Sequence, residues 1–517
     1  MPSEDGGRMG GVPPEVIEFL SGKGGRSLIV KGGAGTGKTT FGLELLERAG
    51  RPGQSYYLST RVGDEALYRQ FPWLKATEMR ARILDAGKLF LDAVRGPSGA
   101  SASPAELPDS EQKKIAAARE IMRSFSDEHG PPTRVERTHL AALLRRNPMP
   151  EVENIYTRIE RTLPEKSLLV IDSLEGVTHK YGLEMEEFVM TLQKDLVEGS
   201  NTNVVMVLEK PEAGGIEYLV DGLLSFVREE LDERRVRHLR LEKLRATAIG
   251  RPRYAVTLAG GRFEALGVRP SDHLSPGQPA SWGPLADPER YYSTGIPDFD
   301  QLLGGGYRRG SFNAFEIDVN VGIDDYYMLF LPTFLNFLTQ SRGMIAILAA
   351  GESHEKLRGT ITRSSPPHLF DTRVRIADYT ASETEESYIV PMARFGRDEA
   401  MRAMVTAEKA ARGPEQKPIL EYTAFDTLES LMGDQAAIRM YFHGVQRAKL
   451  VGNLGIGLLK PGLLMSSEIL NMMDTYFRII NIDNAPCVYG IRPRTRIYAI
   501  SLDPEKGSPH TRLTPIV

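Results

Sequence analysis

One short segment constrains the fold of this chain more than any other. Residues 32–39 read Gly-Gly-Ala-Gly-Thr-Gly-Lys-Thr and satisfy every fixed position of the phosphate-binding pattern G-x-x-x-x-G-K-[ST]. The apolar run Ser27–Val30 precedes them and predicts a buried strand. Thr40–Leu46 follows with apolar residues at helical spacing. Strand, glycine-rich loop and helix are the context that this pattern needs, so the segment predicts an α/β domain with a nucleotide site.

Each residue of the segment has a chemical task in such a site. Glycines let backbone N–H groups converge on phosphate oxygens, and the start of the next helix adds partial positive charge. Lys38 is expected to reach the β- and γ-phosphates, and the Thr39 hydroxyl to ligate Mg²⁺. A glycine-rich turn that binds nothing is the alternative, and the correct flanks argue against it. The predicted ATP-binding residues are Gly32, Gly33, Ala34, Gly35, Thr36, Gly37, Lys38, Thr39 and Thr40.

An acid at the end of a second apolar run completes the predicted metal site. Residues 167–173 read Ser-Leu-Leu-Val-Ile-Asp-Ser, so a strand is expected to end at Asp172. In phosphate-loop proteins an acid at this point holds the Mg²⁺ shell. Apolar runs that end in Asp are common, so the signal gains its weight from the complete loop upstream. ATP and Mg²⁺ are the expected cofactors, with Thr39 and Asp172 on the metal.

The chain also contains an internal repeat. Residues 11–27 and 295–311 share a Gly-x-Pro start, spaced apolar residues and a closing Arg-Ser or Arg-Gly-Ser before a strand. Carried forward in register, Lys38 falls on Ile323, and two acids follow that isoleucine. The second copy therefore lacks the phosphate lysine and would repel a triphosphate. Chance similarity between two α/β domains is the alternative, and the shared start argues against it.

Composition predicts where the domains meet. The predicted division is a first domain at 1–266 with an insertion at 85–150, a linker at 267–290, and a degenerate second domain at 291–517. The insertion begins with a stretch rich in Pro, Ser, Gly and Ala, 96–109, which predicts a flexible loop. Ser110–Phe125 and Thr138–Arg146 then predict helices.

With these residues in view, the chain resembles the RecA-like ATPases of the KaiC and RadA group. Within that group it is most similar to the archaeal gas-vesicle regulator GvpD and its relatives, on the tandem layout and on residues 59–62 and 67–73. The wider resemblance is carried by residues 220–223, 241–245, 293–297, 300–306 and 309–311.

The resemblance implies two tandem RecA-like phosphate-loop domains, the second degenerate, each with a mostly parallel central sheet and helices on both faces. It places the ATP site at the carboxyl ends of the strands. It further implies a ring or dimer in which Lys243 and Arg245 of one subunit reach the γ-phosphate held by its neighbour. A solvated basic strand edge is the alternative reading of these two residues.

One departure from the resembled group concerns catalysis. KaiC-type ATPases carry two glutamates after the second core strand, and here Thr60 and Arg61 stand in their place. A guanidinium cannot act as a base. Glu65, one helical turn later, is therefore a candidate catalytic residue beside Lys38, Lys243 and Arg245, and Glu175 is a second candidate. Slow ATP hydrolysis, or binding without turnover, is expected.

A basic stretch at 234–253 raises the question of nucleic acid. It holds eight Lys and Arg residues against one acid, Glu242, and could follow a phosphate backbone, bind an acidic protein or be neutralised by the acids just upstream. No aromatic residue interleaves with the arginines, which weakens a stacking interaction with single strands. The net charge of −4 implies no global attraction to nucleic acid or to an anionic membrane. Nucleic-acid binding is open but not favoured.

The remaining composition favours a cytoplasmic location. Cys487 is the one cysteine, so no intrachain disulfide can form. No apolar run is long enough to span a membrane, and the polar start of the chain lacks the apolar core of a signal peptide.

We therefore expect a regulatory ATPase whose nucleotide state controls oligomerisation or a protein partner. The resemblance to GvpD implies that this partner is a transcriptional activator which the ATPase antagonises. A DNA-acting, recombinase-like ATPase and a non-hydrolysing, ATP-gated scaffold are the alternatives. An autokinase in the second domain is disfavoured because Ile323 replaces the lysine that would hold ATP.

Overall fold

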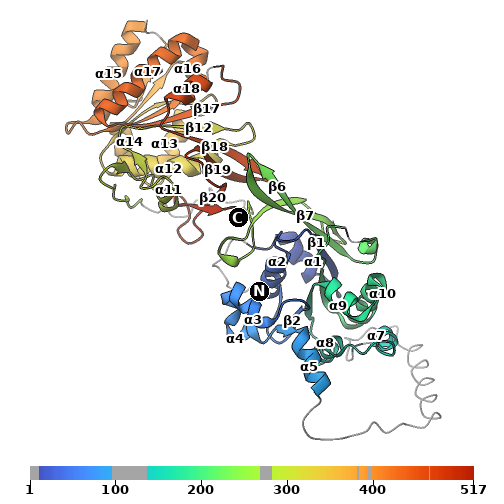
Figure 1. Ribbon diagram of the computed structural model, residues 1–517. Coiled ribbons are helices and arrows are strands. Elements are labelled where there is room, and N and C mark those ends of the chain that lie inside the picture. Colours follow the sequence, from blue (N-terminus) through green and yellow to red (C-terminus); the bar gives the residue numbers. More distant parts are fainter. Residues whose placement is uncertain are drawn as a thin grey trace, which may run out of the picture.

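The computed structural model describes residues 11–95, 135, 137–212, 214–267, 282–380, 383–393, 395, 397–432, 434–464 and 466–517. They form two α/β bodies arranged end to end (Figure 1), the first coloured blue to green and the second yellow to red. Most of the predicted linker and the loop and first helix of the predicted insertion lie outside the described residues. No helix among the described residues has the length and apolarity needed to cross a bilayer.

The first body is built on a nine-stranded sheet with the order β3-β2-β4-β5-β1-β6-β7-β8-β9. The strands from β3 to β6 are parallel, and β7, β8 and β9 continue the sheet antiparallel. Their bounds are β1 (Ser27–Gly32), β2 (Ser55–Ser59), β3 (Ile83–Asp85), β4 (Leu168–Asp172), β5 (Asn203–Val207), β6 (Gly222–Leu231), β7 (Arg234–Leu244), β8 (Arg253–Thr257) and β9 (Glu264–Ala265).

Helices cover both faces of this sheet because its central strands are apolar on both sides. Leu28 and Val30 of β1 pack into one core cluster with Phe41 of the following helix, whereas Ile29 packs into the opposite cluster. The helices are α1 (Pro14–Ser21), α2 (Lys38–Ala49), α3 (Asp64–Gln70), α4 (Thr77–Arg80), α5 (Ala86–Arg95), α7 (Thr138–Leu144), α8 (Pro150–Glu160), α9 (Leu174–Tyr181) and α10 (Met185–Leu192). Short helical turns are η1 (Pro72–Lys75), η2 (Gln193–Glu198), η3 (Ile216–Tyr218) and η4 (Ala259–Gly261).

The second body repeats this topology. Its ten-stranded sheet has the order β15-β14-β13-β16-β17-β12-β18-β19-β20-β21, which is the order of the first sheet with one edge strand, β15, added. The strands are β12 (Phe312–Ile317), β13 (Gly343–Ile347), β14 (Val374–Asp378), β15 (Ile389–Pro391), β16 (Ile419–Ala424), β17 (Leu454–Leu459), β18 (Thr475–Ile482), β19 (Ala485–Arg492), β20 (Tyr498–Leu502) and β21 (Thr511–Pro515), and β10 (Tyr291–Tyr292) pairs with β11 (Tyr307–Arg308).

Its helices again lie on both faces, and aromatic residues dominate the core. Phe315 of β12 contacts the rings of Phe299, Phe330 and Phe477 in one cluster, while Phe312 packs in the other. The helices are α11 (Pro297–Leu302), α12 (Ile323–Thr339), α13 (His354–Thr362), α14 (Pro367–Arg373), α15 (Arg397–Arg412), α16 (Phe425–Met432), α17 (Asp434–Val451) and α18 (Ser466–Met472). The α/β prediction is confirmed, with sheets that are mostly parallel.

The structural repeat has the register that the sequence predicts. Strand β12 corresponds to β1, and helix α12 corresponds to α2. The number of residues that separates the starts of the two strands also separates the starts of the two helices. Ile323 therefore opens α12 at the position where Lys38 opens α2.

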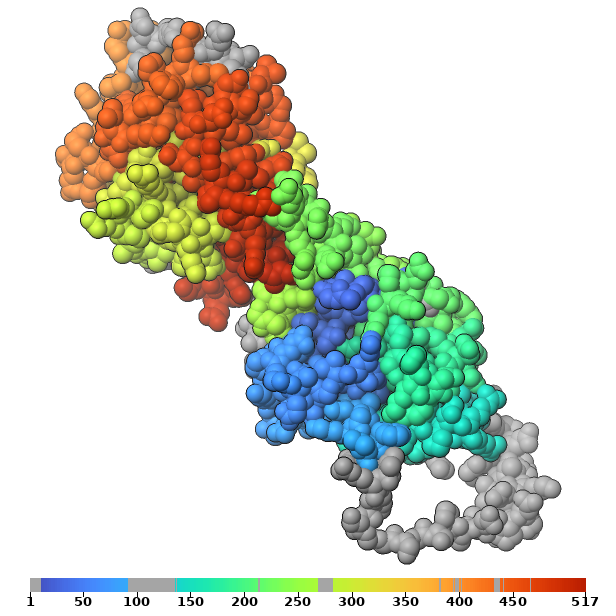
Figure 2. All heavy atoms as spheres, in the orientation of Figure 1, coloured from blue at the N-terminus to red at the C-terminus, as the bar shows by residue number. Residues whose placement is uncertain are grey.

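The two bodies meet along the antiparallel end of the first sheet. Figure 2 shows the light-green β6–β7 region against the red carboxyl-terminal strands. Arg234 donates to the carbonyl oxygens of Gly490 and Thr495, each at 2.7 Å, and its guanidinium lies 4.6 Å from the ring centre of Tyr489. A shared apolar cluster lies beneath, formed by residues of both bodies: Val236, Ala255, Leu266, Ile480, Ile482, Ala485, Cys487, Tyr489, Ile497, Ala499 and Ile516.

A buried glutamate in the second body gives its stability a pH dependence. Burial is the largest influence on Glu421 and raises its pKa to about 7. A hydrogen bond from Asn453 lowers this pKa in part, and the charge of Glu408 raises it further. Between its unfolded pKa and about 7 the folded chain binds the extra proton, so the free energy of unfolding falls as the pH rises, by about 1.4 kcal/mol per pH unit at most. We expect Glu421→Gln to flatten this fall.

Urea unfolding at several pH values from 5 to 7 measures the effect. The exposed Glu505→Gln is the matched control and should keep the slope of the parent chain. Parallel pH profiles for the parent and Glu421→Gln would show that the folded-state pKa of this carboxyl is not raised.

Candidate functional site

The phosphate loop, residues 33–37, joins β1 to α2 and has a conformation that only glycine adopts easily. Gly35 and Gly37 have φ angles of 68° and 112°, in the left-handed region. A Cβ atom on Gly37 would lie 2.9 Å from Cδ2 of Leu258, whereas one on Gly35 would meet nothing within 4 Å. The loop is therefore packed against the body at Gly37 and open at Gly35, where a ligand can approach the backbone.

Lys38 is folded back over this loop. Its ammonium donates to the carbonyl oxygens of Gly32 and Gly33 at 2.6 and 2.7 Å, and the Thr36 hydroxyl donates to Gly33 at 2.9 Å. The lysine is buried, with 8% of its surface exposed. These bonds hold the ammonium at the loop, where a phosphate would take the place of the carbonyl oxygens as its acceptor.

Three carboxylates act on the same lysine. Burial is the largest influence and lowers the pKa of Lys38, while the charges of Asp172, Glu209 and Glu175 oppose it in that order. The resulting pKa lies below the ordinary value of a lysine. A bound polyphosphate would bring further negative charge and raise the pKa again, so ligand and lysine charge stabilise each other.

The predicted metal residues lie together. The Thr39 hydroxyl donates to Oδ2 of Asp172 at 2.7 Å, and the Tyr57 hydroxyl, at the middle of β2, donates to the same oxygen. A hydroxyl and a carboxylate at one point are oxygen ligands of the type that Mg²⁺ takes, and the ion usually keeps water and substrate phosphates as its other ligands. Among the described residues no group of three His, Cys, Asp or Glu side chains could hold a metal by itself. The donor set fits Mg²⁺ that arrives with a nucleotide.

The end of β2 has a structural role in place of the glutamate pair. The Thr60 hydroxyl accepts from the Ser173 backbone N–H at 2.8 Å and donates to the Ser173 carbonyl at 2.9 Å. Arg61 forms an ion pair with Glu209. Thr60 thus fixes the segment after Asp172, and Arg61 brings its charge to an acid beside the loop.

Glu65 does not reach the phosphate loop through any contact of the described residues. It is exposed on α3, and its backbone N–H donates to Oδ1 of Asp64. Glu175, at the start of α9, lies nearer, since its charge acts on Lys38 and its Oε1 accepts the Glu209 N–H at 2.8 Å. Its Oε2 is buried without a hydrogen-bond partner among the described residues. Of these two candidate acids, Glu175 is the one whose charge acts on Lys38.

Glu209 is a residue of the site that sequence reasoning missed. It follows β5 directly beyond the apolar run, as Asp172 ends β4, and adjacent parallel strands bring both to one edge of the sheet. That rule would have found it. Burial acts to raise the pKa of Glu209, but hydrogen bonds from Arg61 and Ser173 and the charges of Arg61 and Lys38 outweigh it and lower the pKa.

Lys243 and Arg245 lie at the other end of the strands of this sheet, opposite the end that carries the phosphate loop. Lys243 pairs with Leu223 of β6, whose neighbour Gly222 pairs with Leu28 at the start of β1, whereas the phosphate loop follows the end of β1. The Lys243 ammonium donates to two backbone carbonyls, and 60% of the Arg245 side chain is exposed beside Asp221. Neither residue contacts the loop of its own chain.

The basic stretch 234–253 is largely occupied within the chain. Glu229 pairs with both Arg240 and Arg253, and Arg251 donates to the carbonyls of residues 253, 266 and 267. Arg234 bonds to the second body. Of the eight basic side chains, only that of Arg235 makes no hydrogen bond or ion pair within the part of the chain that the structure describes.

The corresponding point of the second body is filled by aromatic and acidic side chains. Glu352 accepts from the hydroxyls of Tyr326 and Tyr422 at 2.8 and 2.7 Å. None of residues 318–322, the counterpart of the phosphate loop, has a positive φ. Asp324 pairs with Lys356. This loop therefore lacks both the lysine and the glycine conformation that would turn backbone N–H groups toward a phosphate.

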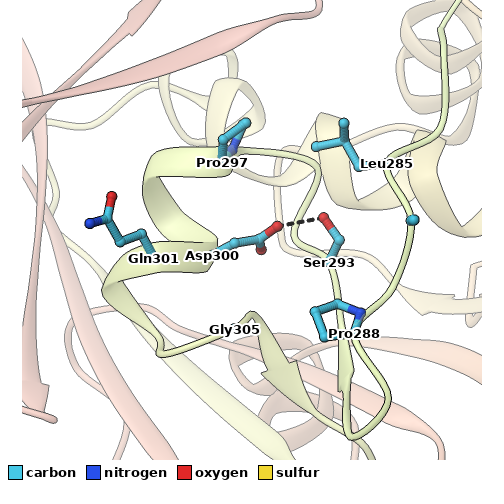
Figure 3. Close-up of a pocket in the computed structure, with 8 residues that line it drawn as sticks. Leu285, Pro288, Ser293, Pro297, Asp300, Gln301 and Gly305 are labelled. Atoms are coloured by element: carbon cyan, nitrogen blue, oxygen red, sulfur yellow. Dashed lines mark hydrogen bonds between the residues drawn. The ribbon is translucent and has the colours of Figure 1, made fainter.

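A pocket of the second body lies elsewhere, at the start of the repeat (Figure 3). Its lining includes Leu285, Pro288, Ser293, Asp300 and Gly305. Ser293 donates to Asp300 at 2.5 Å, as Figure 3 shows, and the same carboxylate accepts the Thr294 N–H at 2.6 Å. The pocket's acid is thus used to hold the turn before α11.

Comparison with known proteins finds one family of proteins along both bodies of the chain. The family description "GvpD gas vesicle protein, P-loop domain" matches residues 16–99, and "GvpD basic region 2" matches residues 281–424. This chain resembles the GvpD proteins. The GvpD2 protein of Halobacterium salinarum is 26% identical over 98% of this chain and 96% of its own length. GvpD1 of the same organism is 24% identical over the same shares. The resemblance to GvpD that the sequence indicates is confirmed, at low identity and along nearly the whole chain.

Proposed function

We propose that this chain is a GvpD-like regulatory protein that binds MgATP in its first body and hydrolyses it slowly. The observation that carries the proposal is the complete phosphate loop with the Thr39 hydroxyl 2.7 Å from Asp172 at its rim. Loop, lysine, hydroxyl and carboxylate converge there from β1, α2 and β4.

The residues divide the work of holding the nucleotide. Backbone N–H groups of 32–40 receive the phosphates, Lys38 moves from its carbonyl acceptors to the β- and γ-phosphates, and Thr39 and Asp172 hold Mg²⁺. Bound Mg²⁺ would neutralise charge that develops on the phosphates. Glu175, with one buried carboxylate oxygen unpaired, is placed to take the proton of the attacking water.

The second body serves as a rigid, non-binding copy. Its tyrosine–glutamate cluster occupies the site, so one nucleotide per chain is expected. The predicted domains, 1–266 and 291–517, then divide into a switch and a scaffold. The second body is joined to the first through the contacts of Arg234. A change in the first body on nucleotide binding could therefore alter the surface that the second body presents to a partner.

The exposed Arg245 and its neighbour Lys243 support an assembly in which they act on another subunit. Because they lie at the end of the strands opposite their own loop, they could reach a phosphate only across a subunit boundary, in a ring or dimer of the kind seen in KaiC-like ATPases. Such a guanidinium stabilises the charge of the transferring phosphoryl group.

The description of the matching family suggests the setting. We infer a role in control of gas vesicle formation in the cytoplasm, with a regulatory protein such as a transcriptional activator as the partner. A DNA-acting ATPase is the weaker candidate, because seven of the eight basic residues at 234–253 have partners inside the chain.

The first prediction concerns binding. Lys38→Ala should weaken MgATP binding by about 10- to 100-fold, the value of one or two charge-assisted hydrogen bonds. Isothermal titration of the full chain measures affinity and stoichiometry, and light scattering measures mass with and without nucleotide. The exposed Lys75→Ala is the matched control. Equal affinities for the parent and Lys38→Ala, or two nucleotides per chain, would contradict the assignment.

The second prediction concerns turnover. Glu175→Gln should retain MgATP binding and lose about 100-fold or more of the phosphate release rate, as expected for removal of a general base. The loss for Glu209→Gln should be smaller, since both of its oxygens are engaged by Arg61 and Ser173. Glu18→Gln, exposed on α1, is the control. Loss of turnover in Glu65→Gln instead would restore Glu65 as the catalytic acid. A parent chain that binds without turnover would be a nucleotide-gated scaffold.

A further inference from the structure

Strand β7 faces the nucleotide site with one side and the second body with the other. Val236 packs in the shared apolar cluster, and His238 lies 2.5 Å from Asp483 of the turn between β18 and β19. Arg237, between them in the strand, points the other way and donates to the Gly35 carbonyl at the phosphate loop, at 3.4 Å. Successive side chains of a strand point to opposite faces of the sheet. Arg237 therefore lies beside the loop, while Val236 and His238 lie at the contact between the bodies.

Arg237 is buried, and most of its hydrogen-bonding capacity is unused. It is 8% exposed, and its Nε and Nη1 have no partner among the described residues. The charged groups that act on it are Arg235 and Arg228, both cationic. Burial, and then these like charges, lower its pKa. A buried guanidinium with two nitrogens unpaired and no acid to neutralise its charge costs free energy and calls for an explanation.

The open side of the loop offers that explanation. Gly35 is the loop residue whose Cβ would meet nothing, so a ligand can reach this point. A guanidinium presents its N–H groups in a planar fork that suits phosphate oxygens, and the nearest expected anion is a nucleotide phosphate on the same loop.

We propose that Arg237 is a phosphate ligand for the nucleotide bound to its own chain. The inference rests on the proposed function. It adds Arg237 to Lys38 as a second cationic side chain of the same chain that contacts the bound nucleotide. It differs from the role of Arg245, which would act on another subunit. Because Arg237 belongs to β7, a loaded site also ties the loop to the strand that contacts the second body.

The test compares Arg237→Met with Arg235→Met in the full chain. Methionine keeps much of the buried aliphatic volume and removes the charge. We expect Arg237→Met to bind MgATP about tenfold or more weakly by isothermal titration, with the apo protein melting at the same or a higher temperature, because an unpaired buried charge has been removed. Arg235→Met, which changes an exposed neighbour on the same strand, should match the parent in both measurements.

The outcomes separate this inference from the proposed function. Unchanged affinity in Arg237→Met, with the parent binding MgATP, would overturn the phosphate role of Arg237 and leave the proposed function standing. A lower melting temperature of the apo protein with unchanged affinity would assign Arg237 to structure alone. A parent chain that binds no MgATP would overturn both. A loss greater for MgATP than for MgADP places the contact at the γ-phosphate, and an equal loss places it at the α- or β-phosphate.

Discussion

The contact of Arg234 with the second body is the interaction on which the arrangement of this molecule depends. Arg234 is 7% exposed, and its guanidinium donates to two backbone carbonyls of the second body and lies over the ring of Tyr489. Around it Asp232 accepts from Tyr489 and Arg478, so the buried charge has an acid close by. The apolar cluster beneath provides buried contact area between the bodies. The hydrogen bonds of Arg234 fix the relative orientation of the bodies, because hydrogen bonds to carbonyl oxygens weaken away from their preferred angles. Two repeats that fold alike are thereby held in one relation.

The two copies show that one fold can carry the features of a phosphate site in one body and lack them in the other. Strand order, helix start and loop position are preserved, and they depend on apolar periodicity and chain length. Phosphate binding depends on a few residues at one edge, so it can disappear without disturbing the core. Glu352 has a pKa raised chiefly by burial and lowered in part by hydrogen bonds from the Ala349 N–H and nearby tyrosines. At this position the second body has a small polar cluster, whose tyrosine hydroxyls donate to the half-buried carboxylate of Glu352.

Much of this could be predicted from the sequence because local patterns decide it. The phosphate loop, the strand that ends at Asp172 and the correspondence of Ile323 with Lys38 follow from motif, periodicity and register. Residues outside a motif could be placed only by the sheet. Glu209 and Arg237 have ordinary neighbours in the sequence, and only strand order shows that β5 and β7 bring them beside the loop. Glu65 shows the converse, since nearness in sequence to β2 did not bring it to the loop.

The alternation along β7 has a consequence for how a nucleotide could be sensed. A ligand shifts a conformational equilibrium only by its difference in affinity for the two states. Consider two conformations that differ in how β7 lies between the bodies. If the loop moved as a unit with β1, nucleotide contacts made solely at the loop would be the same in both conformations. A side chain on β7 changes this, because its distance from the loop depends on how that strand lies between the two bodies. His238 and Arg253 both contact Asp483 across the same boundary, so a shift of the strand would alter those contacts together with the one at Gly35. If nucleotide binding shifts this strand, the coupling is reciprocal, and a partner that fixed the second body against β7 would change nucleotide affinity by the same factor.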